Sequence, residues 1–226
     1  MKAAKRGTTA AKVEKSSDKA GKPAKAPVPK AGLPREVRVI GGVWKRSKLP
    51  VADAPGLRPT PDRVRETLFN WLGQSLDGWR CLDAYAGSGA LGFEAASRGA
   101  AEVTLIERDS RLARGLREVQ ERLKAVQVRI EAADALAWMA RSAPGRFELV
   151  FIDPPFDAEV FLPALKAAAP LVVDGGFVYL EADRAFAEAE LAPLGLVLQR
   201  HGRAGAVHFH LLRRSYTAPQ TPVETV

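Results

Sequence analysis

The stretch Phe147-Glu148-Leu149-Val150-Phe151-Ile152-Asp153-Pro154-Pro155-Phe156 predicts a buried β-strand that ends abruptly in an acid and two prolines. Its β-branched and aromatic residues are typical of a strand. A proline cannot donate to a sheet ladder, so we expect the strand to stop at Asp153. That end of an open α/β sheet is where ligands bind. The carboxylate, the stiff carbonyl groups before the prolines and the ring of Phe156 suit a planar amine better than a phosphate.

Strand and helix patterns alternate on both sides of this stretch. Repeated βα units require right-handed crossovers and therefore predict an α/β fold, a doubly wound and mostly parallel sheet of the Rossmann-like type. Two last strands joined by a glycine-containing turn predict an antiparallel C-terminal hairpin at the sheet edge. The expected strands beside 147–152 are Arg80–Tyr85, Val103–Glu107, Val128–Ala132, Gly176–Glu181, Leu194–Arg200 and Ala206–Arg213.

The 226 residues suffice for one full-sized domain with extensions. The single cysteine, Cys81, excludes an internal disulfide and fits a reduced, cytoplasmic setting. The apolar runs are too short for a membrane span, and no apolar segment follows the charged N-terminus, so we expect neither a membrane segment nor a secretory signal. Histidine and cysteine do not occur at zinc-site spacing, so we expect no metal.

Positive charge is concentrated at the N-terminal end. Residues 1–34 hold nine Lys/Arg and two Asp/Glu, residues 35–65 hold eight and three, and residues 66–226 hold seventeen and twenty-one. This asymmetry predicts a neutral or acidic catalytic body with a cationic front for a polyanion. Residues 1–34 have almost no large apolar side chains and predict a disordered basic tail, which either attracts phosphates or only solubilises the chain.

Residues 35–78 predict a small β-hairpin followed by a helix. Glu36–Ile40 and Val43–Leu49 are the expected strands, with Gly41-Gly42 as the turn. A hairpin that carries Trp44, Lys45, Arg46 and Lys48 suits contact with a nucleic-acid backbone and base stacking; the alternative is a solvated hairpin whose tryptophan packs inward.

The helix of this segment is expected to begin at Thr60, whose hydroxyl would be the N-cap ahead of Pro61. Arg63 and Arg65 lie in its first turn, where cations oppose the helix dipole, which indicates that they serve a ligand. The remaining boundaries that we expect are a core over 79–214 and a flexible C-terminus over 215–226.

A glycine-rich turn, Gly87-Ser88-Gly89-Ala90-Leu91-Gly92, directly follows the first core strand. The pattern alone is shared by nicotinamide, flavin and adenosyl-methionine binders. Asp83 would answer an ammonium group but would repel a pyrophosphate. Glu107 at the end of the next strand is placed to accept ribose hydroxyls, and Asp134, after the third, to accept from an adenine amino group.

Two motifs in this order, Asp83-x-x-Ala86-Gly87-Ser88-Gly89 and Asp153-Pro154-Pro155-Phe156, resemble the class I adenosyl-methionine-dependent amino-methyltransferases. The N-terminal stretch narrows the resemblance. Arg38-Val39-Ile40-Gly41-Gly42 and Gly56-Leu57-Arg58-Pro59-Thr60, with Asp62 to Leu72, closely resemble the RsmD-type methyltransferases, which modify the exocyclic amine of a guanine in small-subunit ribosomal RNA.

The resemblance implies a function for each motif. S-adenosyl-methionine would be the cofactor, and the N2 amine of a guanine in 16S rRNA would be received by Asp153, Pro154 and Phe156. The partner would be small-subunit rRNA, free or within an assembling 30S particle. For the protein itself we expect a cytoplasmic monomer. The implied cofactor-binding residues are Asp83, Ala86, Gly87, Ser88, Gly89, Glu107 and Asp134. The residues that we expect to contact RNA are Trp44, Lys45, Arg46, Lys48, Arg58, Arg63 and Arg65.

Three other functions fit parts of the sequence. The nearest is another amino-methyltransferase that acts on adenine N6 of DNA or RNA, because Asp-Pro-Pro-Phe serves both amines. A nicotinamide-dependent oxidoreductase fits the glycine pattern, but nothing supplies a partner for hydride transfer. A non-catalytic RNA-binding module would not need Asp153 or the complete glycine turn.

Overall fold

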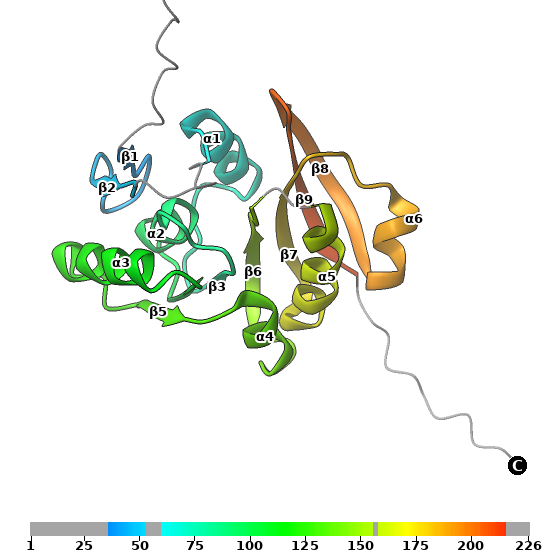
Figure 1. Ribbon diagram of the computed structural model, residues 1–226. Coiled ribbons are helices and arrows are strands. Elements are labelled where there is room, and N and C mark those ends of the chain that lie inside the picture. The colour runs from blue at the N-terminus through cyan, green and yellow to red at the C-terminus, as the bar shows by residue number, and fades with distance from the viewer. Residues whose placement is uncertain (1–35, 53–59, 156–157, 216–226) are drawn as a thin grey trace, which may run out of the picture. The chain divides into compact units, whose positions relative to one another are not determined.

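The computed structural model describes residues 36–52, 60–155 and 158–215, all of which belong to the unit Leu33–Val226 (Figure 1). The basic tail expected over 1–34, Arg58, Phe156 and the C-terminal residues from 216 onward lie outside the described residues. Within the described part of the chain, no helix is both long enough and apolar enough to cross a membrane.

A seven-stranded sheet with the order β5-β4-β3-β6-β7-β9-β8 forms the centre of this unit. The strands β3 to β7 are parallel, and β9 runs antiparallel to both β7 and β8. The predicted doubly wound, mostly parallel sheet with an antiparallel C-terminal hairpin is therefore confirmed. The strands are β3 Arg80–Asp83, β4 Glu102–Glu107, β5 Val128–Ala132, β6 Phe147–Ile152, β7 Val172–Ala182, β8 Leu196–Ala204 and β9 Val207–Arg214.

Helices cover both faces of the sheet (Figure 1). Alternate strand residues point to opposite faces, so Phe151 belongs to one core with α1, α2 and α3, whereas Ile152 belongs to the other with α4, α5 and α6. The helices are α1 Asp62–Trp71, α2 Ala90–Ser97, α3 Ser110–Leu123, α4 Ala135–Ala140, α5 Ala158–Ala168 and α6 Glu188–Leu191, with 3-10 turns at Ala169–Leu171 and Ala192–Leu194.

The N-terminal hairpin is shorter than expected. Its strands are β1 Glu36–Arg38 and β2 Lys48–Pro50, so the prediction of a strand over Val43–Leu49 is wrong at its start. Residues 41–46 form turns instead. The backbone N–H groups of Val43 and Trp44 donate to Ser97 at the end of α2, at 2.8 and 2.9 Å, and not to β1. The loop that carries Trp44 is therefore seated on α2.

The start of α1 also differs from the expectation. Pro61 occupies the N-cap position, and no side chain caps the helix. The Thr60 hydroxyl donates instead to Asp153 Oδ2, at 3.1 Å. A residue that local rules assign to a helix start thus makes its hydrogen bond at the end of β6.

Arg65 is fully buried, which corrects the expectation that it contacts RNA. Its guanidinium donates to Asp62 Oδ1 at 2.6 Å, to the Arg38 carbonyl at 2.8 Å and to Glu94 Oε2 at 3.3 Å. A charged side chain without solvent contact needs such partners. Its place in the first turn of α1 therefore reflects internal pairing, not a free cation.

Glu94, on α2, is the carboxylate that joins these parts. It is fully buried and accepts from the backbone N–H groups of Ile40 and Gly41, at 2.7 and 2.8 Å, as well as from Arg65. Arg98 Nε donates to Glu94 Oε1 at 2.8 Å. One side chain therefore fixes the N-terminal loop, α1 and α2 together.

We expect Glu94→Ala to lower the free energy of unfolding by about 3–5 kcal/mol, because it leaves two buried guanidinium groups without their shared carboxylate. Urea denaturation followed by circular dichroism measures the change. As a control, Glu131→Ala removes an ion pair with Arg129, whose side chain is 73% exposed, and should change stability by about 0.5 kcal/mol or less. Equal effects of the two variants would contradict the assigned role of Glu94.

Candidate active site

The four acids singled out in the sequence lie at one edge of the sheet. Asp83 and Glu107 end β3 and β4, Asp134 follows β5, and Asp153 follows β6 directly. Because these strands are parallel, their carboxyl ends meet at the same edge. The order of the strands reverses between β3 and β6, which is where open α/β sheets bind ligands.

The glycine turn between β3 and α2 lies at this edge. Gly87 and Gly89 have φ angles of +52° and +76°, which L-residues with a side chain rarely adopt. A Cβ on Gly89 would lie 2.6 Å from the Phe93 ring and 2.7 Å from the Leu116 side chain. The turn is therefore closely packed against the side chains of Phe93 and Leu116, and it presents backbone rather than side chains to a ligand. Ser88 is buried within it.

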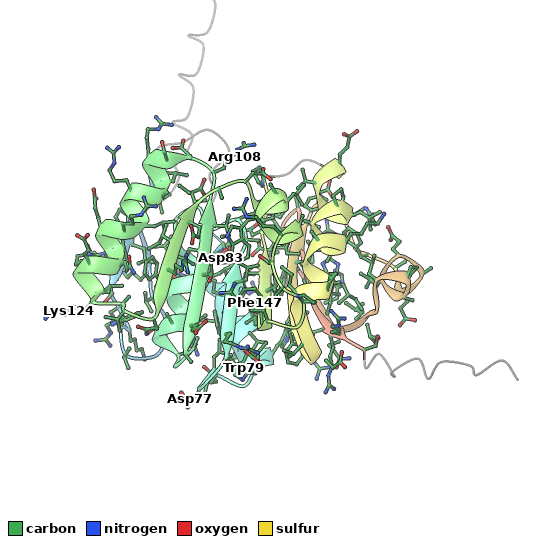
Figure 2. All side chains as sticks on the ribbon, turned by 90° about the horizontal axis from the view of Figure 1, so that it is seen from below. Asp77, Trp79, Asp83, Arg108, Lys124 and Phe147 are labelled. Atoms are coloured by element: carbon green, nitrogen blue, oxygen red, sulfur yellow. The ribbon has the colours of Figure 1, made fainter. Side chains whose placement is uncertain are left out.

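Asp83 is buried beneath the turn, in the interior of the molecule (Figure 2). Its Oδ2 accepts from the Gly92 backbone N–H at 3.0 Å. Its Oδ1 is buried and has no hydrogen-bond partner among the described residues. Burial raises the pKa of Asp83 to about 7. An acceptor oxygen without a donor at the edge of a glycine turn fits a ligand that brings a donor, such as an ammonium group.

Glu107 holds the turn in place. Its Oε2 accepts from the Gly87 backbone N–H at 2.9 Å, and its Oε1 accepts from the Asp109 N–H at 2.7 Å. The side chain is half-buried, so a ligand hydroxyl can still reach its remaining lone pairs. Asp134 is exposed and caps α4 by accepting from the Ala137 N–H at 2.9 Å.

Tyr85 is a residue that the sequence reasoning missed. Its hydroxyl is buried without a hydrogen-bond partner among the described residues. Burial, with the nearby charge of Asp134 adding to it, raises the pKa of Tyr85 to about 12. In the sequence it lies between Asp83 and the glycine turn, and this position is a signal that could have identified it.

The end of β6 holds a second polar cluster. Asp153 is half-buried, Pro154 is buried and Pro155 is exposed. Thr60 donates to Asp153, and Glu181 on the adjacent β7, only 3% exposed, accepts from the Tyr179 hydroxyl at 2.8 Å. Sequence reasoning gave Thr60 a capping role and gave Glu181 none, although an acid at the end of an apolar strand was a readable signal.

Apart from Arg58, which lies outside the described residues, and the buried Arg65, the expected RNA-binding side chains divide into three groups. Lys45, Arg46 and Arg63 are exposed, and no ion pair of theirs occurs among the described residues. Lys48 is exposed, but its Nζ lies 3.0 Å from Glu36 Oε2. Trp44 is half-buried and packs against the core. This agrees in part with the alternative that the tryptophan of the hairpin packs inward.

A cavity of about 300 Å³ lies elsewhere, on the side of the sheet that α4 covers, and Thr104, Trp138 and Arg146 contribute to its lining. It contains none of the residues that the motifs singled out. Across the described residues, no cluster of three or more His, Cys, Asp or Glu side chains is arranged to hold a metal ion.

Comparison with known proteins agrees with this geometry. Residues 37–213 match the family model described as "Conserved hypothetical protein 95". Ribosomal RNA small subunit methyltransferase D of Escherichia coli is 42% identical over 185 residues, which cover 79% of this chain and 90% of that protein. The relative of that name from Haemophilus influenzae is 46% identical over 124 residues, 54% of this chain and 64% of its own length.

Solved structures give the same result. The putative methyltransferase yhhF from Escherichia coli superposes with a TM-score of 0.71 at 36% identity, covering 80% of this chain and 98% of that one. The putative methylase HI0767 from Haemophilus influenzae gives 0.67 at 32% identity, with 80% and 99% covered. A magnesium protoporphyrin IX methyltransferase from Synechocystis, solved with bound SAM, gives 0.56 at 20% identity, which indicates the shared fold alone.

The sheet order, the glycine turn and these likenesses define the protein as a class I methyltransferase. Within that class, the chain belongs to the family of ribosomal RNA small subunit methyltransferase D, which confirms the resemblance found in the sequence.

We expect Gly92→Ala to destabilise the protein by about 1–3 kcal/mol, because a Cβ there would overlap the Leu105 side chain and lie 3.2 Å from Asp83 Oδ2. Thermal and urea unfolding measure the loss. Gly115→Ala, in α3, is the matched control: nothing lies within 4 Å of its Cβ position, so removal of a helical glycine should stabilise by about 0.5–1 kcal/mol. Effects of the same sign would contradict close packing at Gly92.

Proposed function

We propose that this protein transfers a methyl group from S-adenosyl-methionine to the exocyclic N2 amine of a guanine in small-subunit (16S) rRNA. The observation that carries the proposal is the position of Asp153, directly after β6 and close enough to Asp83 for the two charges to interact. A carboxylate for an amine thus lies beside a turn suited to the methyl donor. The family membership of the chain supports the choice of substrate.

Residues of the glycine turn and its neighbours would hold the donor. Asp83, whose Oδ1 has no hydrogen-bond partner among the described residues, would accept from the ammonium group, directly or through water, and the backbone of Ala86–Gly89 would approach the donor closely. Glu107 would accept from the ribose hydroxyls, and Asp134 from the adenine amino group. When bound, S-adenosyl-methionine supplies an electrophilic methyl group on a sulfonium.

The guanine amine needs activation because its lone pair is delocalised into the ring. Hydrogen bonds from its two N–H groups to the Asp153 carboxylate and the Pro154 carbonyl would draw the nitrogen toward tetrahedral geometry. Fixed acceptors also stabilise the positive charge that develops on this nitrogen, and positioning lowers the barrier further. Phe156 would stack on the base, a contact worth about 1–3 kcal/mol. The base must be unpaired or flipped outward to reach this site.

The N-terminal part would bind the RNA backbone. Lys45, Arg46 and Arg63 offer exposed cations, and the loop that carries the first two is seated on α2. In this proposal residues 35–78 contact RNA, residues 79–214 hold the donor and the target amine, and the protein acts as a monomer on free rRNA or on an assembling 30S particle.

We expect the protein to methylate 16S rRNA at guanine N2, with the modified base mapped by mass spectrometry on naked RNA and on partly assembled small subunits. Asp153→Ala should lower turnover by at least about 100-fold, while the affinity for S-adenosyl-methionine, measured by calorimetry, stays within about threefold. A modified adenine would support the competing adenine N6 activity. Unchanged turnover would overturn the role of Asp153.

Replacement of Lys45, Arg46 and Lys48 by glutamine should weaken RNA binding and reduce the slope of log K against log salt by up to about 2–3, since each phosphate contact contributes about 0.7–0.9. Filter binding across a salt series measures this slope. The control replaces three exposed arginines elsewhere, Arg129, Arg141 and Arg200, and should leave the slope nearer to that of the wild type. If the two triple variants lose slope equally, the basic loop is not a specific RNA contact.

A further inference from the structure

We propose that Glu181 is a second carboxylate of the target site, which shares one proton with Asp153 through the Thr60 hydroxyl and acts as a positioning residue for methyl transfer. This inference rests on the proposed function and deepens it, because it states how Asp153 becomes able to receive the amine.

The sheet brings the two carboxylates together. Strands β6 and β7 are parallel, with Ile152 opposite Leu180, so Asp153 and Glu181 are the next residues on adjacent strands, which lie about 4.8 Å apart. Phe151 and Tyr179, two residues earlier on the same two strands, share the core beneath α1. By strand alternation, Asp153 and Glu181 face the same side.

Among the described residues, the groups that contact this pair are hydroxyls and not cations. Thr60, itself only 4% exposed, donates to Asp153 Oδ2 and also interacts with Glu181. The Tyr179 hydroxyl donates to Glu181 Oε1. Asp83 on β3 adds a further negative charge near Asp153. Among the described residues, the groups that shift the titration of either carboxyl include no basic side chain.

Glu94 offers an instructive contrast inside the same protein. It is buried as completely as Glu181, yet two arginines neutralise it. A buried carboxylate that serves architecture alone is normally paired in this way. Glu181 lacks such a cation within the described part of the chain, and it adjoins the proposed catalytic acid.

Burial raises the pKa of Asp153 well above its usual value, and the charge of Glu181 raises it further. Burial likewise raises the pKa of Glu181, although the hydroxyls of Tyr179 and Thr60 oppose this effect. Glu181 is buried and Asp153 is half-buried, and two adjacent carboxyls of this kind cannot both ionise readily, so they titrate as a pair. The pair therefore retains one proton to a higher pH than an isolated carboxyl would.

Sharing one proton with Glu181 allows Asp153 to be ionised in the target site. If Asp153 kept the proton, it would be a poor acceptor for an amine N–H. With the proton on Glu181, Asp153 is ionised and can accept from the guanine amine. As the guanine nitrogen bonds to the methyl carbon, the carbon–sulfur bond breaks with its electrons staying on sulfur, and one N–H proton passes to Asp153. The pair then holds two protons and releases one to solvent.

Glu181→Gln tests the proposal, because glutamine keeps the shape and can still accept from Tyr179. In the wild type the proton can lie on either carboxyl, so the acid limb of kcat against pH should follow two ionisations, whereas in Glu181→Gln it should follow the single ionisation of Asp153. The plateau value of kcat should change little, because glutamine, like protonated Glu181, carries no charge, and the affinity for S-adenosyl-methionine should stay within about threefold. A residue that only supports packing would alter KM or stability and leave the limb in place. An unchanged limb overturns the proposal.

A second measurement does not depend on activity. The folded pKa of each acid of the pair is raised, so the stabilisation from their protonation is complete below their unfolded values, about 4, and is lost as the pH rises through the folded values. The Tm of the wild type should fall as the pH rises above these unfolded values, and that of Glu181→Gln should fall less. Glu131→Gln, on the edge strand β5, should keep the wild-type slope.

The two arms separate the possible failures. If the wild type methylates guanine but Glu181→Gln keeps both its acid limb and its Tm slope, the shared proton is wrong and the proposed function stands. If the wild type methylates no guanine, the proposed function fails. In that case the Tm slopes still decide whether the pair shares a proton.

Discussion

The Glu94 carboxylate, held out of solvent between Arg65 and Arg98, is the contact on which the arrangement of the N-terminal third depends. It lies on α2, the helix that the glycine turn opens, and it accepts from the backbone of Ile40 and Gly41. The surface proposed for RNA and the turn proposed for the methyl donor are thus two ends of one short helix. A buried ion pair of this kind contributes modest net stability but is costly to break, so it fixes a geometry more than it strengthens the fold. Such a contact would keep the proposed RNA-binding surface at a fixed position relative to the site of the methyl donor.

The parts of the fold that the sequence predicts well are those with local causes. An apolar strand closed by two prolines at 154–155 and a turn that needs positive φ at Gly87 and Gly89 carry their own physical reasons. The expected strand at Val43 failed because the competing partner, Ser97, lies more than fifty residues away. Arg65 failed in the same way: the dipole argument was sound, but the carboxylate that decides its position, Glu94, is 29 residues distant. Local sequence propensity contains no information about partners that are so distant in the sequence.

The candidate site divides along the same line. Strand-end acids such as Asp83 and Asp153 follow from the topology of a parallel sheet, because every strand of it delivers its last residue to one edge. Thr60 illustrates the limit: its capping propensity is real, yet its hydroxyl reaches Asp153, 93 residues on. Glu181 became meaningful only once β7 was known to adjoin β6. Two carboxylates that are remote in sequence become one titrating unit through strand order, which is information that no single segment contains.

The two free edges of the sheet bear on how the protein behaves in concentrated solution. One edge is β5, which carries Arg129 and Glu131, and the other is β8, where Arg200 and Arg203 are exposed. Unpaired edges are templates for strand-to-strand association, and charges along them oppose it. The charges on β5 and on β8 of the antiparallel hairpin therefore oppose edge-to-edge pairing of two copies of the sheet.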